Sequence, residues 1–310
     1  MSALSQVDTG EEEEVRTQLA RIAVLPPAAG GWRIARLPSL TNRSYLVEPC
    51  ELDAGEAYVL RLPGKGTERY IDRAGELANA RAAAAIGLAP PILHGDPDSG
   101  VMLSRYLRGA VPLSAERLRE PGVLGAAVGL LKRLHGSGLA FRGEMRLYPK
   151  IDQYLALAGT AELRALRRQG ERLRPLLEPG WNAWAPCHID PAPGNFVAAE
   201  GRHYLLDWEY AAMCEPLWDL AGLSIEGRFD GRQDAALIRL YFGAAEERRW
   251  LSRLHLYRIM LRLVAAAWGA VQVAEGNGAA TAAELVDPLL AASAADLGAP
   301  ELGGHIQAAA

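Results

Sequence analysis

The chain has 310 residues, of which 50% are hydrophobic, 23% charged and 7% aromatic. These values are those of an ordinary globular protein and exclude a disordered or fibrous chain. Lys and Arg total 33 against 37 Asp and Glu, and the resulting net charge of −4 gives no electrostatic reason to expect a nucleic-acid or anionic-membrane partner. The length fits one large domain or two of modest size.

Composition also bears on location and on the chemistry available. No apolar run approaches the ~20 residues of a spanning helix, and the first residues carry an acidic block where a secretory signal has positive charge. We therefore expect a cytoplasmic protein with no membrane partner. The widely spaced Cys50, Cys187 and Cys214 predict reduced thiols rather than a disulfide framework. Lysine is scarce, so phosphate binding must depend on arginine.

The first hundred residues predict a strand-rich region. Residues 1–10 are polar and expected to be disordered, and acidic then apolar residues at helical spacing predict a helix over 11–25, ended by two prolines. An alanine-rich pattern predicts a second helix over 70–86. Short apolar and branched segments between turn residues predict strands at 32–37, 44–47, 57–62, 92–94 and 101–105.

After Gly109 the pattern becomes mainly helical. Helices are predicted at 115–118, 123–139, 154–157, 161–177, 233–241, 247–274 and 281–296. Loops and two short strands are predicted over 185–207, and the tail beyond Gly303 is expected to fray. We therefore predict an α+β protein in two parts, a small strand-rich one over 1–108 and a larger helical one over 109–310.

The most informative stretch runs from His188 to Asn195, and Asp207 follows twelve residues later. Its groups suit phosphoryl transfer, because Asp190 could receive a hydroxyl proton while the oxygens of Asn195 and Asp207 could hold Mg²⁺ against nucleotide phosphates. An H-x-D followed by an Asn is common by chance, and the downstream carboxylate makes it specific. A hairpin pairing 196–197 with 204–206 would bring Asn195 and Asp207 together.

Six ordered blocks across roughly residues 15–275 resemble the choline/ethanolamine kinases, especially the bacterial choline-kinase-like branch, within the aminoglycoside phosphotransferase and protein-kinase-like superfamily. The blocks are LTNRSYLV at 40–47, YVLRLPG at 58–64, IDRAGE at 71–76, CHIDPAPGNF at 187–196, LDWEY at 206–210 and PLWDL at 216–220. The resemblance implies a two-lobed protein-kinase-like fold. Its N-terminal lobe, an antiparallel sheet with a helix, would bind nucleotide, and its helical C-terminal lobe would carry the catalytic and acceptor-binding residues.

The same resemblance assigns the catalytic groups and the phosphate turn. It implies that Asp190 is the catalytic base and that Asn195 and Asp207 bind Mg²⁺. The turn that covers the nucleotide phosphates would include three residues, Ser39, Thr41 and Asn42, with Ser39 where the family commonly has glycine.

Further members of the nucleotide site follow from the resemblance. Arg61 occupies the strand position of the protein-kinase lysine, with Glu76 as its ion-pair partner on the next helix; a solvated helix face is the alternative reading of Glu76. Tyr106 would end the hinge that meets the adenine. Asp219 would anchor the catalytic loop through backbone hydrogen bonds, and for His188 we favour a loop-supporting role over proton transfer.

The acceptor is expected to be a small-molecule alcohol. Aromatic faces and carboxylates recognise a quaternary ammonium, and Glu209, Tyr210 and Trp268 match the family's positions for this. The sequence thus predicts transfer of the γ-phosphate of MgATP to choline or a related amino alcohol. Two alternatives stay open: a kinase for another alcohol such as thiamine or an aminoglycoside, and a nucleotide-binding pseudokinase. The oligomeric state is not predicted.

Overall fold

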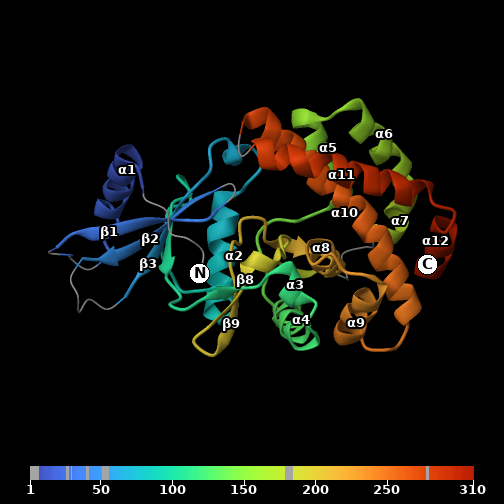
Figure 1. Ribbon diagram of the computed structural model, residues 1–310, viewed down its shortest axis with the longest axis horizontal. Helices are drawn as coiled ribbons and strands as arrows, with labels where there is room; N and C mark the ends of the chain where they lie inside the picture. Colours follow the sequence, from blue (N-terminus) through green and yellow to red (C-terminus); the bar gives the residue numbers. More distant parts are fainter. Residues whose placement is uncertain are drawn as a thin grey trace. The chain divides into compact units, whose positions relative to one another are not determined.

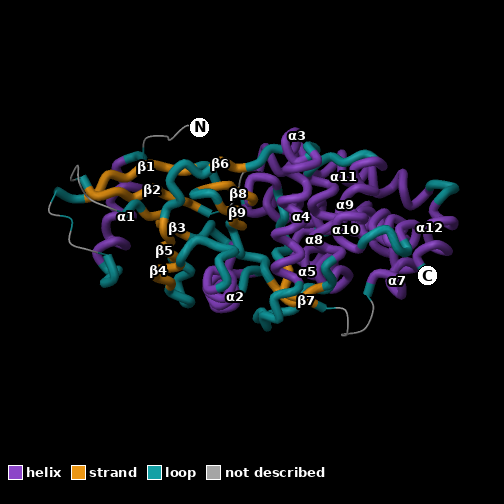
Figure 2. Tube along the Cα trace, turned by 90° about the horizontal axis from the view of Figure 1, so that it is seen from below, coloured by secondary structure: helices purple, strands orange, loops and turns teal. Residues whose placement is uncertain are grey.

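The computed structural model describes residues 7–25, 28, 30–39, 42–50, 56–178, 184–276 and 279–310. The chain forms two compact units, the first made of Met1–Val111 with Val197–Glu209 and the second of Pro112–Phe196 with Tyr210–Ala310. Among the described residues, 55% are helical and 15% lie in strands, and Figure 2 shows most strands in the first unit and most helices in the second. The architecture is therefore α+β, as predicted.

An antiparallel sheet is the centre of the first unit (Figure 1). Its strands, in the spatial order β1-β2-β3-β5-β4, are β1 (Trp32–Leu37), β2 (Arg43–Pro49), β3 (Tyr58–Leu62), β5 (Met102–Arg105) and β4 (Ile92–Gly95). All five strands lie within a residue or two of their predicted positions, because alternating apolar residues between turn signals specify strands locally. The register places Ser44 of β2 opposite Arg61 of β3.

Three helical segments accompany this sheet: α1 (Thr9–Ala20), the short 3₁₀ helix η1 (Thr67–Arg69) and α2 (Arg73–Ala85). Helix α1 contributes Val15 and Leu19 to a core shared with Tyr45, Val47 and Leu60 of the sheet. Burying these apolar side chains is the main force that holds α1 to the sheet.

The predicted N-terminal disorder needs correction at its end, and the first helix at both ends; residues 1–6 of the stretch expected to be disordered lie outside the described residues. Helix α1 begins at Thr9, inside the stretch expected to be disordered, because the Asp8 side chain accepts a hydrogen bond from the Glu11 amide at 2.8 Å and caps it. It ends at Ala20 rather than at residue 25, and Ile22 N–H donates to the Leu19 carbonyl in a tight turn. The prolines that follow set only an outer limit for the helix.

A second sheet has three strands among the described residues. It contains β6 (Val111–Pro112), β8 (Phe196–Ala199) and β9 (Arg202–Leu205), in the order β6-β8-β9. The β8–β9 hairpin is the one predicted downstream of Asn195. The Leu205 amide donates to the Leu88 carbonyl at 2.7 Å, which fastens the hairpin to the end of α2 within the first unit.

The second unit is built from helices around one strand pair. The pair is β7 (Ala185–Cys187) with β10 (Ala212–Cys214). The helices, with two 3₁₀ turns, are α3 (Ala115–Leu118), α4 (Pro121–His135), α5 (Leu147–Ala158), α6 (Ala161–Gln169), η2 (Gly170–Leu173), α7 (Arg174–Leu177), η4 (Pro193–Asn195), α8 (Leu217–Glu226), α9 (Gly231–Phe242), α10 (Glu247–Glu275), α11 (Ala279–Gly298) and α12 (Leu302–Ala309). Helix α10 is the core element and packs against α5, α8, α11 and α12.

Three expectations for this unit are wrong. The helix predicted over 161–177 is interrupted by η2, and α7 then begins with Pro175 in its first turn, since proline has no N–H to continue an α-helical hydrogen-bond ladder. The tail beyond Gly303 is not frayed but forms α12, because buried Leu302 and Ala309 pack inward. Helix α8 is present in the structure, although the sequence patterns did not predict it.

Helix α10 also qualifies the expectation about membranes. Within the described part of the chain it is long and apolar enough to cross a bilayer, although the sequence suggested that no run came close. The apolar stretch of α10 is 67% buried inside the protein. Its composition is accordingly that of a core helix, which must be apolar on nearly every side.

Candidate active site

The loop that carries the predicted base follows β7 directly. Asp190 and Asn195 lie in this loop, and the Asn195 Nδ2 donates to the Asp190 carbonyl at 2.9 Å and to its Oδ2 at 3.1 Å. The amide therefore sets the orientation of the carboxylate. Since Nδ2 faces Asp190, the amide oxygen of Asn195, which is the atom that binds hard cations, points away from it.

Backbone strain lies next to the predicted base. Ile189 has φ 74°, a left-handed conformation that is unfavourable for a β-branched residue. Helix α8 holds both backbone polar groups of Ile189: Asp219 Oδ1 accepts from its amide at 2.7 Å, and Trp218 Nε1 donates to its carbonyl at 2.9 Å. The α8 contacts thus offset the strain and fix the direction in which the chain enters Asp190.

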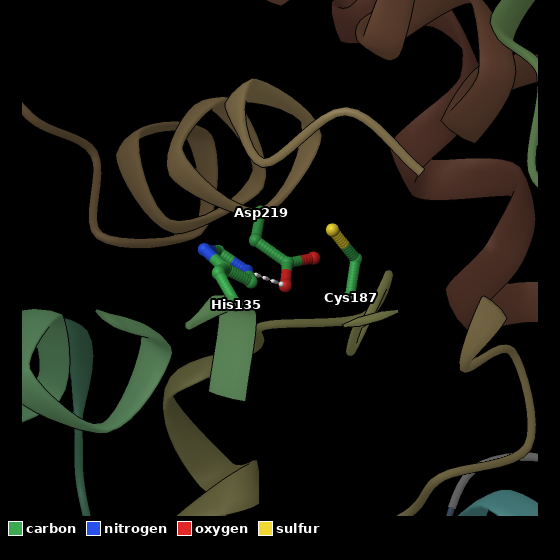
Figure 3. A group of neighbouring side chains, drawn as sticks. All are labelled: His135, Cys187 and Asp219. Atoms are coloured by element: carbon green, nitrogen blue, oxygen red, sulfur yellow. Dashed lines mark hydrogen bonds and ion pairs between the residues drawn. The ribbon is translucent and has the colours of Figure 1, made fainter. Parts of the chain in front are cut away.

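Asp219 is the residue of α8 that anchors the Asp190 loop through hydrogen bonds to its backbone. It is fully buried, and its Oδ2 accepts from the His188 amide at 2.8 Å and lies 2.9 Å from His135 Nε2 (Figure 3). His135 Nδ1 in turn lies 2.7 Å from the Tyr241 hydroxyl. Asp219 therefore makes the backbone hydrogen bonds that the resemblance implies, and His188 is fully buried and held through its own amide.

The Asp219 cluster also has the composition of a possible metal site. One ligand atom each from His135, Cys187 and Asp219 lies within 4.8 Å of the others (Figure 3). Burial raises the pKa of the Cys187 thiol well above its ordinary value. Because both Asp219 oxygens already accept hydrogen bonds, we interpret the cluster as a loop anchor.

The arginine predicted to bind nucleotide lies in the first unit. Arg61 on β3 forms an ion pair with Glu76 on α2, and its Nη2 donates to the Gly100 carbonyl at 3.1 Å. Glu76 is only 3% exposed, which rules out a solvated helix face. Burial opposes the charge on Arg61, yet Glu76, with Asp207 and Glu209, raises its pKa. Arg61 Nε is buried and has no hydrogen-bond partner among the described residues, so it is an available donor.

A ring of buried polar groups surrounds this pair. Arg73 donates to Glu76 at 2.8 Å, to Glu209 at 3.4 Å and to the Thr67 hydroxyl at 2.5 Å. Asn42 donates to Glu209 at 2.9 Å and accepts from the Gly64 amide at 3.3 Å. The ring thereby ties the end of the phosphate turn, the loop after β3 and the segment after β9 into one network.

The remaining predicted nucleotide residues are placed as follows. Ser39 Oγ donates to the Asn42 carbonyl at 2.5 Å, which closes the turn, and Thr41 lies outside the described residues. Tyr106 follows β5, and its amide donates to the Ala57 carbonyl at 2.8 Å. Asp207 is exposed, with φ 60°, in the first unit.

The predicted acceptor residues divide into two sets. Tyr210 and Trp268 lie together in the second unit, where the indole Nε1 donates to the Tyr210 hydroxyl at 3.0 Å. Glu209 is buried in the first unit, and its carboxylate is engaged with Asn42 and Arg73. Within the described contacts Glu209 therefore acts as a member of the buried ring.

Sequence reasoning missed three side chains that the structure brings to these groups. Arg73 lies three residues before Glu76, a spacing that pairs opposite charges on a helix and was a readable signal. His135 and Lys150 gave no such signal, because their partners come from distant parts of the chain. Lys150 Nζ lies 5.9 Å from the Tyr210 ring centroid.

Comparison with known proteins gives consistent results. The model of the phosphotransferase enzyme family, APH, matches residues 33–252. Protein LicA from Haemophilus influenzae is 29% identical over 212 residues, which cover 65% of this chain and 76% of LicA. The crystal structure of a choline/ethanolamine kinase family protein from Mesorhizobium loti has a TM-score of 0.79 and 35% identity, and covers 96% of this chain and 98% of that one.

Further solved structures share the fold. Choline kinase LicA from Streptococcus pneumoniae has a TM-score of 0.74 at 23% identity, covering 92% of this chain and 100% of that chain. A structure of LicA in complex with AMP has a TM-score of 0.73 at the same identity and coverage. The matches and the observed elements define a two-lobed protein-kinase-like phosphotransferase that acts on an alcohol group. The chain belongs to the phosphotransferase enzyme family and, within it, to the choline/ethanolamine kinases.

Proposed function

We propose that this protein transfers the γ-phosphate of ATP to the hydroxyl of choline or a closely related amino alcohol. The observation that carries the proposal is the Asn195-oriented carboxylate of Asp190, on a loop that Asp219 holds by its backbone. The family relationship and the relative bound to AMP support nucleotide as the phosphate donor. The hydrogen-bonded Tyr210 and Trp268 supply aromatic faces suited to a cationic head group.

In this mechanism Asp190 acts as the base. Its carboxylate accepts the proton of the acceptor hydroxyl as the oxygen forms a bond to the γ-phosphorus, and the bond to the β–γ bridging oxygen breaks with release of ADP. Asn195 keeps Asp190 oriented during this step. Transfer of this kind depends mainly on positioning and on electrostatic stabilisation, which is why a rigid loop is needed.

The donor set fits Mg²⁺. Asn195 offers an amide oxygen turned away from Asp190, and Asp207 offers an exposed carboxylate, both hard ligands that suit this cation. Asn195 directly precedes β8 and Asp207 follows β9 by two residues, and the pairing of these strands supports our assignment of the two residues as ligands. When bound, Mg²⁺ would offset negative charge on the nucleotide phosphates.

Arg61 is proposed to bind the phosphates from the first unit. Its guanidinium is held by Glu76 and by the Gly100 carbonyl, while the buried Nε remains as a donor. A fully charged, planar guanidinium suits phosphate oxygens and accounts for phosphate binding in a protein with so few lysines. Burial opposes the charge on Arg61, and Glu76, followed by Asp207 and Glu209, offsets this and raises its pKa.

The test is ADP release with Mg²⁺ and ATP across choline, ethanolamine, thiamine and an aminoglycoside. We expect turnover with choline or ethanolamine, and a loss of at least about 10²-fold in kcat for Asp190→Asn, since general-base catalysis contributes about that much. The exposed Asp152→Asn is the matched control and should behave as wild type. Turnover only with thiamine or the aminoglycoside would replace the acceptor, and ATP binding without any turnover would indicate a pseudokinase.

A further inference from the structure

A lysine ammonium already lies on the aromatic face proposed for the acceptor. Lys150 on α5 places Nζ 4.7 Å from the Tyr154 ring centroid and 5.9 Å from that of Tyr210. Both distances are within the range of a cation–π interaction. Trp268 holds the Tyr210 hydroxyl from α10, a helix that packs against α5, so all four side chains belong to one cluster in the second unit.

The ammonium has little other stabilisation. Its one hydrogen bond among the described residues is to Gln153 Oε1 at 3.1 Å, a neutral amide, and no ion pair with a described carboxylate accompanies it. The residue is half-buried, and desolvation lowers the pKa of Lys150 to about 8. A desolvated cation without a counter-charge depends on the ring faces to a greater extent than an exposed lysine does.

We propose that Lys150 determines acceptor specificity by occupying the cation position on Tyr210, so that a cationic acceptor must displace its ammonium in order to bind. The inference rests on the proposed function, because it concerns the acceptor side of that reaction. Two positive charges cannot share one ring face in a poorly solvated site without repulsion. The flexible lysine side chain can swing away when a cationic acceptor binds. A neutral alcohol does not repel the ammonium, and it also gains less binding energy from the tyrosine ring.

The decisive variant removes the charge and keeps the length. We expect Lys150→Met to lower KM for choline by about 3- to 10-fold, with kcat within about 2-fold of wild type, the range that one cation–π contact spans. Lys150→Arg keeps the charge and should resemble wild type. Lys132→Met is the matched control, since Lys132 Nζ also lies 5.9 Å from a tyrosine ring centroid, that of Tyr241, but on an exposed residue away from Tyr210.

A neutral substrate separates charge competition from a general change of shape. 3,3-Dimethylbutan-1-ol has the shape of choline without its charge, so its KM should change by less than about 2-fold in Lys150→Met. A fall in KM for both alcohols would indicate that the lysine merely obstructs space, and would overturn the inference. Thermal unfolding of each variant verifies that the fold is intact.

The outcomes also separate this inference from the proposed function. If the wild type phosphorylates choline and the choline KM of Lys150→Met is unchanged or higher, the inference is wrong and the function stands. If no cationic alcohol is phosphorylated, the proposed acceptor is wrong, and calorimetric titration with tetramethylammonium decides the inference alone. Tighter binding to Lys150→Met than to wild type would support it, and equal or absent binding would overturn it.

Discussion

The two segments that carry the proposed site carboxylates, Asp190 and Asp207, are held in different ways. The Asp190 loop is held in the second unit by one carboxylate, Asp219, that accepts from two backbone amides. The segment after β9 is held in the first unit by side chains, through Glu209, Arg73 and Asn42. A backbone anchor constrains the path of the chain whatever the loop side chains are, whereas a side-chain network is sensitive to each member, because removing one leaves a buried charge uncompensated.

The largest effect should come from the backbone anchor. Asp219→Ala leaves two buried amides and His135 without their acceptor, so we expect a loss of about 3–5 kcal/mol in the free energy of unfolding and little remaining kinase activity. Urea unfolding and ADP release measure the two effects. Asp219→Asn retains one acceptor oxygen and should fall between the alanine variant and wild type. Equal unfolding free energies for all three proteins would show that Asp219 does not anchor the loop.

A smaller effect is expected in the side-chain ring. Arg73→Met removes the cation shared by Glu76 and Glu209, and we expect it to cost about 2–4 kcal/mol in unfolding free energy. Adding Glu209→Gln to this variant should recover part of the loss, because fewer uncompensated charges remain. Strict additivity of the two changes in urea unfolding would show that the pair is not coupled.

An exposed ion pair shows how small the stability effect of a charge pair is when it is not buried as in the network around Arg73. Arg105 and Glu200 in the same unit pair at 2.9 Å, with side chains 30% and 40% exposed. Glu200→Gln should therefore change the unfolding free energy by less than about 1 kcal/mol.

A pH-dependent effect concerns the buried charged pair that directly precedes helix α8. Glu215 precedes α8 and pairs with Arg253 at 2.6 Å, yet burial raises the pKa of Glu215 to about 7. The folded state then binds this proton more tightly than the unfolded chain, so the contribution of Glu215 to stability is fully present below about pH 4.5 and falls by on the order of 3 kcal/mol as pH rises through about 7. Glu215→Gln should remove this slope in urea unfolding, and an unchanged slope would assign it to other groups.

The sequence predicted much of the fold and part of the candidate site. The strands of the first sheet and most helices follow from local periodicity, and Asp190 with Asn195 follows from residue types in a short, irregular loop. The corrected tail has a tertiary cause, because α12 packs against α10. The break in the helix predicted over 161–177 has a local cause, because Pro175 lacks the N–H that an α-helix needs. Helix α1 differs because one Asp8 side chain caps it earlier than the apolar pattern begins.

The sequence by itself determined the helices and strands, the family, and the candidate site residues Asp190 and Asp207. These features depend on residues that are near one another along the chain. Only the tertiary structure decided that Arg73 reaches Glu209, that His135 meets Asp219, and that Lys150 lies near the Tyr210 ring. His135 and Asp219, like Arg73 and Glu209, are separated by more than eighty residues. Such contacts arise only when packing of apolar surfaces brings distant elements together, and no local pattern encodes them.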